Sequence, residues 1–159
     1  MSFRKDFMWG VASSAYQIEG GAFDDGKGAS VWDMFTHQTG KIREEHNGDV
    51  ACDHYHRYEE DVELMAELGV KCYRFSISWP RIIPNGIGEV NRAGVDFYNR
   101  LIDCLLAHNI TPIATLFHWD YPYELEKRGA WLNPDSSDWF AYYAKVCAEE
   151  FGDRCKVFY

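Results

Sequence analysis

Four runs of apolar residues in this chain have the composition of buried β-strands, and long helical segments separate them. The runs cover residues 7–17, 70–79, 110–119 and 155–159. They are rich in β-branched, aromatic and small residues, which is typical of strands that are covered on both faces. The last run, CKVFY, reaches the end of the sequence, so we expect only the beginning of a fourth strand there.

The segments between these runs have helical periodicity. Apolar residues recur every three or four positions over 58–68, 95–106 and 140–151. Gly69 and Asn109 follow the first two stripes, and both residue types accept the left-handed conformation that often ends a helix. The spacing therefore predicts three amphipathic helices, one between each pair of consecutive strands.

Alternation of strand and helix predicts a parallel sheet in an α/β fold. The repeating unit is about 40–45 residues long, and eight such units would make a TIM (β/α)8 barrel of roughly 300 residues or more. We therefore expect residues 1–159 to be the amino-terminal part of a single barrel domain and to supply about its first three and a half βα units. Because a closed barrel needs every strand, a fragment or one piece of a split barrel is expected. A doubly wound sheet is the alternative.

Composition and charge argue against several classes of function. The formal net charge of -9 disfavours nucleic-acid binding. The sequence contains neither an apolar run long enough to span a membrane nor a standard secretory signal, so we expect no membrane partner. Its five cysteines are irregularly spaced, which indicates reduced thiols and a cytoplasmic location.

Two short motifs resemble cofactor sites but do not meet their requirements. The segment GAFDDGKG at 21–28 nearly matches a phosphate-binding loop, but Gly28 stands where a Ser or Thr should hold Mg²⁺. His54 and His56 are two residues apart, which is the wrong spacing for one helix face, and no further pair completes a zinc pattern. We therefore expect neither a metal nor another cofactor.

The two faces of the predicted strand at 70–79 differ. Alternate residues from Lys71 to Trp79 are bulky, whereas the other face is small and polar around a single cation, Arg74. A guanidinium keeps its charge, so burial requires an anionic partner. The sequence predicts a carboxylate or an anionic ligand beside Arg74, as a structural salt bridge or as part of a site.

Polar and aromatic residues stand where two other strands are predicted to end. Gln17 closes the first run, and His118 and Trp119 close the third. Ligand sites in parallel sheets and barrels lie at the carboxyl ends of the strands. We therefore expect Gln17, Arg74, His118 and Trp119 to converge on one mouth, with purely structural roles for Arg74 and His118 as the alternative.

Several long segments closely resemble the amino-terminal part of family 1 glycoside hydrolases, the β-glucosidase family. They include FMWGVASSAYQIEG, and together they extend over nearly the whole chain at 7–20, 53–88, 97–122 and 151–159. The resemblance implies a (β/α)8 barrel and retaining hydrolysis of β-glycosides through a glycosyl-enzyme intermediate. It also implies an acid/base glutamate in an Asn-Glu-Pro motif after the fourth strand and a nucleophilic glutamate near the end of the seventh. Neither motif occurs in this sequence.

The same resemblance assigns roles to the four converging residues. Gln17 and His118 resemble residues that hydrogen-bond the hydroxyls of the cleaved sugar, and an imidazole can both donate and accept. Trp119 resembles a flanking donor and wall for the sugar ring. Arg74 resembles the arginine that supports the nucleophile by keeping its carboxylate ionised. The implied partners are a β-linked glucoside or oligosaccharide and a remaining barrel segment or companion chain.

Two carboxylates near these residues are not expected to react. Glu19 looks structural in the family pattern, and Asp120 is expected to orient its loop or neighbouring side chains. Without the two catalytic glutamates, the chain alone is expected to be inactive. The alternatives are a non-catalytic half-barrel that binds sugar or a partner subunit, and an unrelated α/β binding protein.

Overall fold

The computed structural model describes residues 2–159. Three parallel strands form a sheet in the order β1, β2, β3, with bounds Gly10–Ala12, Cys72–Ser76 and Thr111–Thr115. The register places Arg74 between Ala12 and Ile113 of the flanking strands. Because the strand order follows the sequence without a reversal, this sheet has the topology of a barrel segment rather than of a doubly wound sheet.

Helices connect the strands and surround the carboxyl edge of the sheet. The α-helices are α1 (Ala15–Ile18), α2 (Val31–Thr36), α3 (His54–Glu67), α4 (Trp79–Ile82), α5 (Arg92–Ala107), α6 (Tyr123–Glu126) and α7 (Ser136–Phe151). Two short 3₁₀ helices, η1 and η2, cover Arg43–Glu45 and Ala130–Leu132. The three predicted amphipathic helices correspond to α3, α5 and α7.

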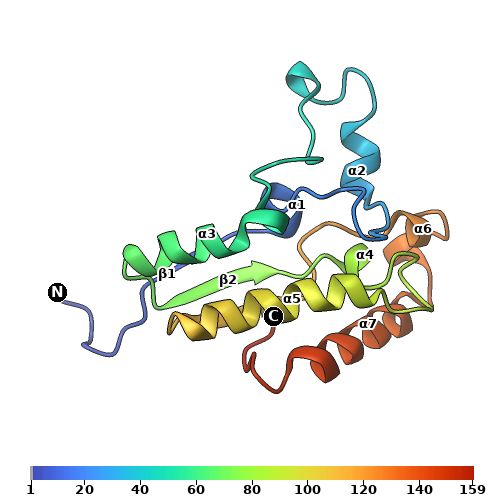
Figure 1. Ribbon diagram of the computed structural model, residues 1–159. Coiled ribbons are helices and arrows are strands. Elements are labelled where there is room, and N and C mark those ends of the chain that lie inside the picture. The colour runs from blue at the N-terminus through green and yellow to red at the C-terminus, as the bar shows by residue number, and fades with distance from the viewer. Residues whose placement is uncertain (1) are drawn as a thin grey trace.

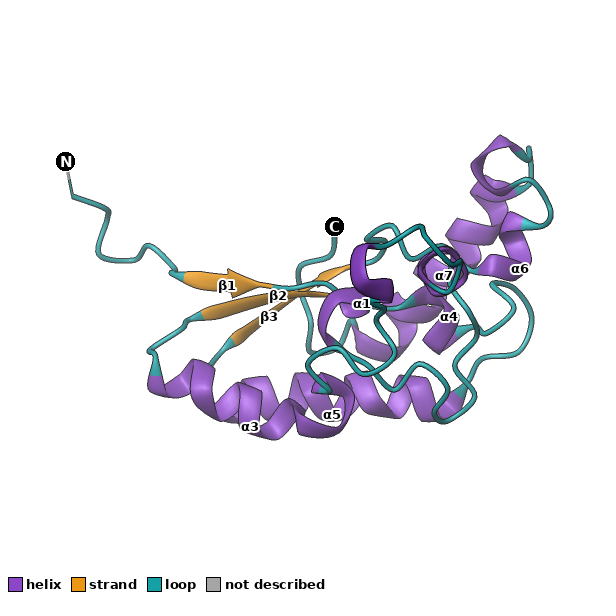
Figure 2. Ribbon diagram, turned by 90° about the horizontal axis from the view of Figure 1, so that it is seen from above, coloured by secondary structure: helices purple, strands orange, loops and turns teal. Residues whose placement is uncertain are grey.

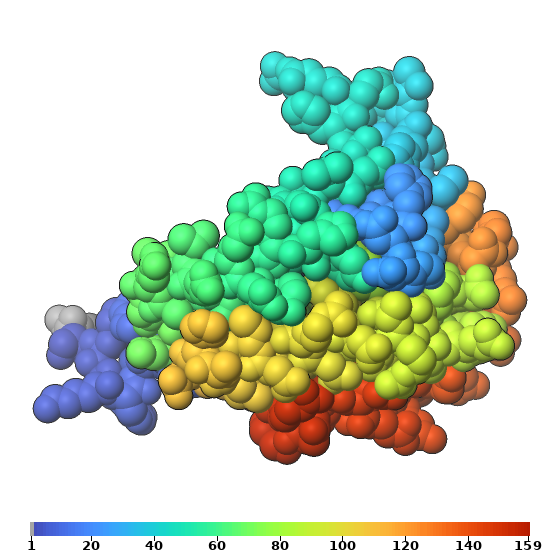
Figure 3. Space-filling view, in the orientation of Figure 1, coloured from blue at the N-terminus to red at the C-terminus, as the bar shows by residue number. Residues whose placement is uncertain are grey.

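The long and the short helices occupy different places around the sheet. Helices α3 and α5 lie along one face of it, while α1, α4 and α6 gather beyond the carboxyl ends of the strands (Figures 1 and 2). The segment of α2 and η1 projects from the body, as the space-filling view shows (Figure 3). This arrangement places the short elements where a parallel barrel holds its site.

The core forms between the bulky face of β2 and the helices that cover it. Tyr73 and Phe75 are 3% and 2% exposed, and Phe97 and Tyr98 of α5 are fully buried against this layer. The Phe75 and Tyr98 rings stack with centroids 6.2 Å apart. The predicted difference between the two faces of this strand is therefore confirmed. Burial of each large apolar side chain contributes about 1.5–3 kcal/mol, which holds the helices on this face.

The strands are shorter than the apolar runs predicted. The first run was interpreted as a strand over 7–17, but the chain leaves the sheet after Ala12 and turns into α1, whose Ala15 N–H donates to Ser76 Oγ over 2.7 Å. The second run stops because α4 begins at Trp79, with Pro80 in its first turn, where the missing N–H has no cost. Apolar composition alone does not separate a strand from the buried short helix that follows it.

The predicted helix ends and the fourth strand are found in the structure. Gly69 and Asn109 both have a positive φ, of 74° and 58°. The run at 155–159 lies parallel to β3, where Ala114 and Phe158 form a bridge. The fourth strand has therefore begun, as expected.

A buried ion pair joins the end of α1 to α4, and a hydrogen bond joins it to α5. Glu19 Oε2 accepts a hydrogen bond from Arg81 Nε over 3.0 Å, and its other oxygen accepts one from the Tyr98 hydroxyl. Glu19 is 4% and Arg81 1% exposed, and the guanidinium lies 4.0 Å from the Tyr55 ring centroid. Glu19 thus has the structural role that was expected of it.

The isolated chain is expected to self-associate. The outer edge of β1 is unpaired within residues 2–159, and the nearby rings of Phe3, Phe7 and Trp9 are exposed and pack on one another. Unpaired edges and exposed apolar clusters favour association. Sedimentation velocity at micromolar concentration should therefore show oligomers, whereas a stable, compact monomer would contradict this prediction.

Candidate functional site

A hollow of about 320 Å³ lies beyond the carboxyl ends of the strands, between α1, α2 and the loop after β3. This volume is within the range of small-molecule pockets. Its lining residues are Ser14, Tyr16, Gln17, Trp32, Thr36, Ile42, His118 and Trp119. The structure therefore brings together three of the four residues singled out from the sequence, and the fourth, Arg74, contacts one of them.

Gln17 and the His118–Trp119 pair reach this hollow from different elements than the sequence indicated. Gln17 belongs to α1, one turn beyond β1, rather than to a strand end. His118 and Trp119 follow β3 by three and four residues and lie in the loop before α6. The prediction that these three residues stand at the ends of strands was therefore wrong, although all of them lie on the predicted side of the sheet.

Arg74 fixes the protonation and orientation of His118. Its Nη1 donates to His118 Nδ1 over 3.2 Å, so Nδ1 is the accepting nitrogen and the ring proton lies on Nε2. Burial and the positive charge of Arg74 lower the pKa of His118 below its usual value. The ring is therefore neutral and offers one donor, Nε2–H, which corrects the expectation that it both donates and accepts.

The predicted anionic partner of Arg74 is not found within residues 2–159. Its other hydrogen bond goes to the Ser13 carbonyl oxygen over 3.4 Å, and none of the ion pairs in this part of the chain includes Arg74. The structural salt bridge is therefore excluded among the described residues. Both contacts of the guanidinium are neutral, so its charge is available to an anion beside His118.

Trp119 is a wall between two hollows. Its side chain is 72% exposed, and its backbone is left-handed with φ of 74°. Trp119 and Trp32 both line the 320 Å³ hollow and a second one of about 410 Å³, whose other residues come from α2, from Gln38 just after it and from α6. Two indole faces beside polar groups suit a ligand with an apolar face and a polar rim.

Sequence reasoning missed the contribution of α2 and of Tyr16 in α1 to this site. Trp32 stacks on Tyr16 with ring centroids 6.1 Å apart, and the Tyr16 hydroxyl hydrogen-bonds Thr36 over 2.8 Å. The aromatic residues of the segment VWDMF are a compositional signal. However, α2 has only six residues, and no periodicity indicates that it lies over the strand ends.

The motifs set aside in the sequence have structural partners. Lys27 of the phosphate-loop-like segment is ion-paired with Asp33 over 2.9 Å. His54 and His56 each bind a separate carboxylate, Asp61 and Asp53, over 2.6 Å. Within residues 2–159, no group of three or more His, Cys, Asp or Glu side chains is arranged to hold a metal ion.

None of the helices within residues 2–159 combines the length and the apolar character needed to cross a bilayer.

The strand order, the outer helices and the hollow at the carboxyl edge define part of a (β/α)8 barrel protein. The chain matches the model of glycosyl hydrolase family 1 over residues 1–159, and it belongs to this family. The third alternative, an unrelated α/β binding protein, is thereby excluded.

Several relatives cover nearly the whole of this chain. It is 54% identical to the 1,4-beta-D-glucan glucohydrolase of Thermotoga neapolitana, over 97% of this chain and 36% of that protein. It is 56% identical to the coniferin beta-glucosidase of Pinus contorta, over 98% of this chain and 30% of that protein. The chain therefore spans about a third of the length of the curated relatives it matches.

A solved structure shows the same backbone arrangement. The β-glucosidase of Thermotoga maritima, determined in complex with noeuromycin, is similar with a TM-score of 0.97 and 54% identity, covering 98% of this chain and 36% of that one. The same relative has also been determined with deoxynojirimycin. The three strands and their helices thus correspond to one segment of a complete β-glucosidase.

Proposed function

We propose that this chain supplies the sugar-binding side of a retaining β-glycosidase that hydrolyses β-glucosides or related β-glycosides. The observation that carries the proposal is the single hollow lined by Gln17, His118 and Trp119, with Arg74 hydrogen-bonded to His118. The names of the relatives, which are β-glucosidases and a glucan glucohydrolase, support a β-linked glucoside or oligosaccharide as the substrate.

The proposed binding follows from the hydrogen-bonding groups and the indole face that line the hollow. Gln17 offers an amide that donates and accepts, and His118 offers only Nε2–H because Arg74 occupies Nδ1. Trp119 presents an apolar face to the sugar ring. A pyranose has hydroxyls around its rim and apolar C–H faces, which match this set of groups.

Arg74 has an electrostatic part in the proposed reaction. Retaining glycosidases hold two carboxyl groups about 5–5.5 Å apart, one of which attacks the sugar and must be ionised. The charge of Arg74 lacks an anionic partner within residues 2–159, and a nearby cation lowers the pKa of a carboxyl group. We assign Arg74 to the support of a nucleophilic glutamate that the rest of the barrel contributes, together with the acid/base glutamate.

The remaining partner is a further barrel segment or a companion chain, and the proposed location is the cytoplasm. All five cysteines are free thiols, and Cys147 and Cys155 are buried, which supports a reducing compartment. A non-catalytic half-barrel is the second candidate. It is less well supported, because the relatives on which the assignment rests are named as enzymes.

The proposal predicts that the 159-residue chain alone does not hydrolyse p-nitrophenyl β-glucoside. Joining it to the rest of a family 1 barrel, hereafter called the complete enzyme, should produce turnover, because the two glutamates are then present. Release of p-nitrophenol measures both. Clear turnover by the purified chain, or a folded complete enzyme without turnover of any β-glycoside, would contradict the proposal.

A further inference from the structure

Asp120 follows the His118–Trp119 pair, but its side chain is turned into the protein rather than into the hollow. It is 2% exposed, and neither carboxyl oxygen has a hydrogen-bond partner within residues 2–159. An unpaired polar group in the interior is costly, so such groups are normally satisfied by protein or by a bound molecule. The position of Asp120 therefore points to a ligand or to a protonated carboxyl group.

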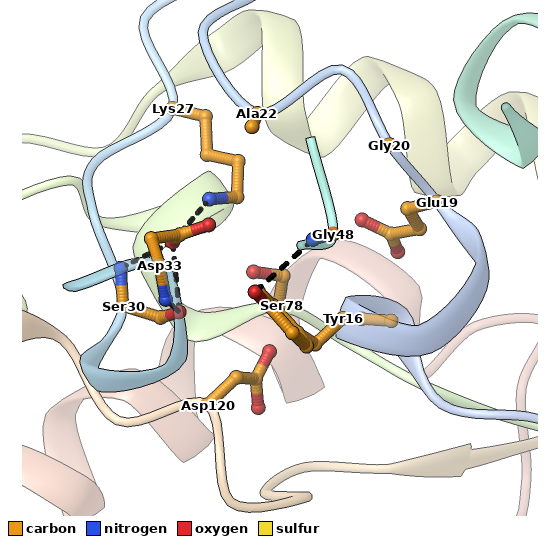
Figure 4. A pocket seen from close by; sticks show the side chains of 11 residues that line it. Tyr16, Glu19, Gly20, Ala22, Lys27, Ser30, Asp33, Gly48, Ser78 and Asp120 are labelled. Carbon is orange, nitrogen blue, oxygen red and sulfur yellow. Dashed lines mark hydrogen bonds and ion pairs between the residues drawn. The ribbon is translucent and has the colours of Figure 1, made fainter. Parts of the chain in front are cut away.

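A small polar cavity faces the Asp120 carboxyl group (Figure 4). Its volume of about 10 Å³ is close to what one buried water molecule requires, and such waters normally have two to four polar partners. The polar side chains that line it are Tyr16, Glu19, Lys27, Ser30, Asp33 and Ser78. The cavity thus has the size and the chemistry of a site for a single water.

The charged groups around this cavity are already paired with one another. Lys27 Nζ binds Asp33 Oδ2, which also accepts from the Ser30 backbone N–H over 2.6 Å. Glu19 is held by Arg81, as described above. No cation is therefore left over for Asp120 among the described residues that line the cavity.

Burial outweighs the neighbouring groups that favour the charged form of Asp120. It raises the pKa of Asp120 to about 7 and the Glu19 carboxylate adds to the rise, while the Asp120 backbone N–H, Lys27 and the Ser78 hydroxyl group oppose it. The other titratable side chains near it are Tyr16 and Asp33, which line the cavity, and Tyr143 of α7; burial raises the pKa of each of the two phenols. A neutral carboxyl group can donate as well as accept, so a protonated Asp120 suits the cavity.

The backbone next to Asp120 is strained and must be held in place. Trp119 has a left-handed φ of 74°, which a residue with a bulky side chain adopts only when its surroundings impose it. The residues after this left-handed turn at Trp119 are held by α2 and its cap: the Tyr121 carbonyl oxygen accepts from the Val31 N–H over 2.8 Å, and Pro122 forms a β-bridge with Ser30. Before the turn, Arg74 holds His118.

We propose that Asp120 is a positioning residue of the sugar site: its neutral carboxyl group and one water bound in this cavity anchor the strained turn that presents His118 and Trp119. The inference rests on the proposed function, because the benefit of this anchor is the placement of the two sugar-facing side chains. It adds a buried water as a ligand of the turn. It also adds a neutral form of Asp120, which the reaction itself does not require.

Two variants of the complete enzyme separate this role from a general structural one. Asp120→Asn keeps the shape, one donor and one acceptor, whereas Asp120→Ala removes all of them. Deoxynojirimycin binding by calorimetry and the kinetics of p-nitrophenyl β-glucoside are the measurements. We expect Asp120→Ala to weaken binding and kcat/KM at least tenfold and Asp120→Asn to remain within threefold of the unmodified enzyme. Asp138→Asn, at an exposed position on α7, is the matched control and should change neither.

The pH dependence of stability is a readout that still works if Asp120→Ala does not fold. A folded-state pKa of about 7, above the ordinary value, gives stability that is present at low pH and lost as pH rises to about 7. The melting temperature of the unmodified enzyme should therefore fall relative to that of Asp120→Asn between about pH 4 and 7. Asp138→Asn should show no such trend.

The outcomes distinguish this inference from the proposed function. A folded, unmodified complete enzyme that neither binds deoxynojirimycin nor turns over a β-glycoside would overturn both. With an active enzyme, the inference alone is overturned if Asp120→Asn is as damaging as Asp120→Ala, if Asp120→Ala is harmless, or if the two melting curves do not diverge with pH. A high-resolution structure should show one water hydrogen-bonded to Asp120, and a dry cavity would contradict the water site.

Discussion

Replacing His118 with alanine in the complete enzyme is expected to lower kcat/KM for p-nitrophenyl β-glucoside by about 100-fold or more. Arg74 leaves His118 a single free donor, Nε2–H, aimed at the hollow that we assign to the sugar. Hydrogen bonds to sugar hydroxyls that strengthen in the transition state contribute several kcal/mol in glycosidases, and each ~1.4 kcal/mol changes the rate tenfold. Steady-state kinetics measure the loss.

His108 provides the matched control for this substitution. It is an exposed histidine at the end of α5, hydrogen-bonded to the Cys104 carbonyl oxygen and remote from the hollow. His108→Ala should leave kcat/KM within about twofold, since substitutions of exposed residues far from a binding site or a buried contact have small effects. If His118→Ala were equally harmless, the sugar-binding role of His118 would be wrong.

Replacing Glu19 with alanine is expected to destabilise the complete enzyme by about 3–5 kcal/mol, the range for removing one partner of a buried ion pair. The substitution leaves the Arg81 guanidinium charged and 1% exposed, and it also removes the acceptor of the Tyr98 hydroxyl. The midpoint of urea unfolding and the melting temperature both measure the loss.

The control for this second prediction is Glu63→Ala. Glu63 is exposed on α3, the helix whose Tyr55 ring packs on the Arg81 guanidinium. This variant should remain within about 0.5 kcal/mol of the unmodified protein. A loss of less than about 1 kcal/mol in Glu19→Ala would show that the buried pair contributes little and that α1 is held by packing instead.

The regular parts of the fold were predictable because they repeat. Periodicity identified α3, α5 and α7, and alternation identified the buried face of β2, because both patterns depend on which residues face the core. Strand bounds were not predictable in the same way. From β1 into α1 the chain reads GVASSAYQ, without a proline or a charged residue to mark a boundary, and only the hydrogen bond from Ala15 to Ser76 shows where the strand gives way to a helix.

The site was predictable where its residues follow strands and not where it depends on long-range packing. His118 and Trp119 come soon after β3, so the carboxyl-edge rule found them. Trp32 reaches the hollow from a six-residue helix that is too short for its periodicity to indicate where it lies. The requirement for an anionic partner singled out Arg74. The cation that is deeply buried among residues 2–159 and has a carboxylate partner is instead Arg81, and that partner, Glu19, lies 62 residues earlier in the sequence.

A crystal structure of the complete enzyme with deoxynojirimycin tests the central claim most directly. We expect the ligand in the 320 Å³ hollow, with hydroxyl groups within hydrogen-bond distance of the Gln17 amide and of His118 Nε2, and with the Trp119 indole beside the ring. Arg74 should remain hydrogen-bonded to His118 Nδ1. A ligand bound clear of Gln17, His118 and Trp119 would contradict the account.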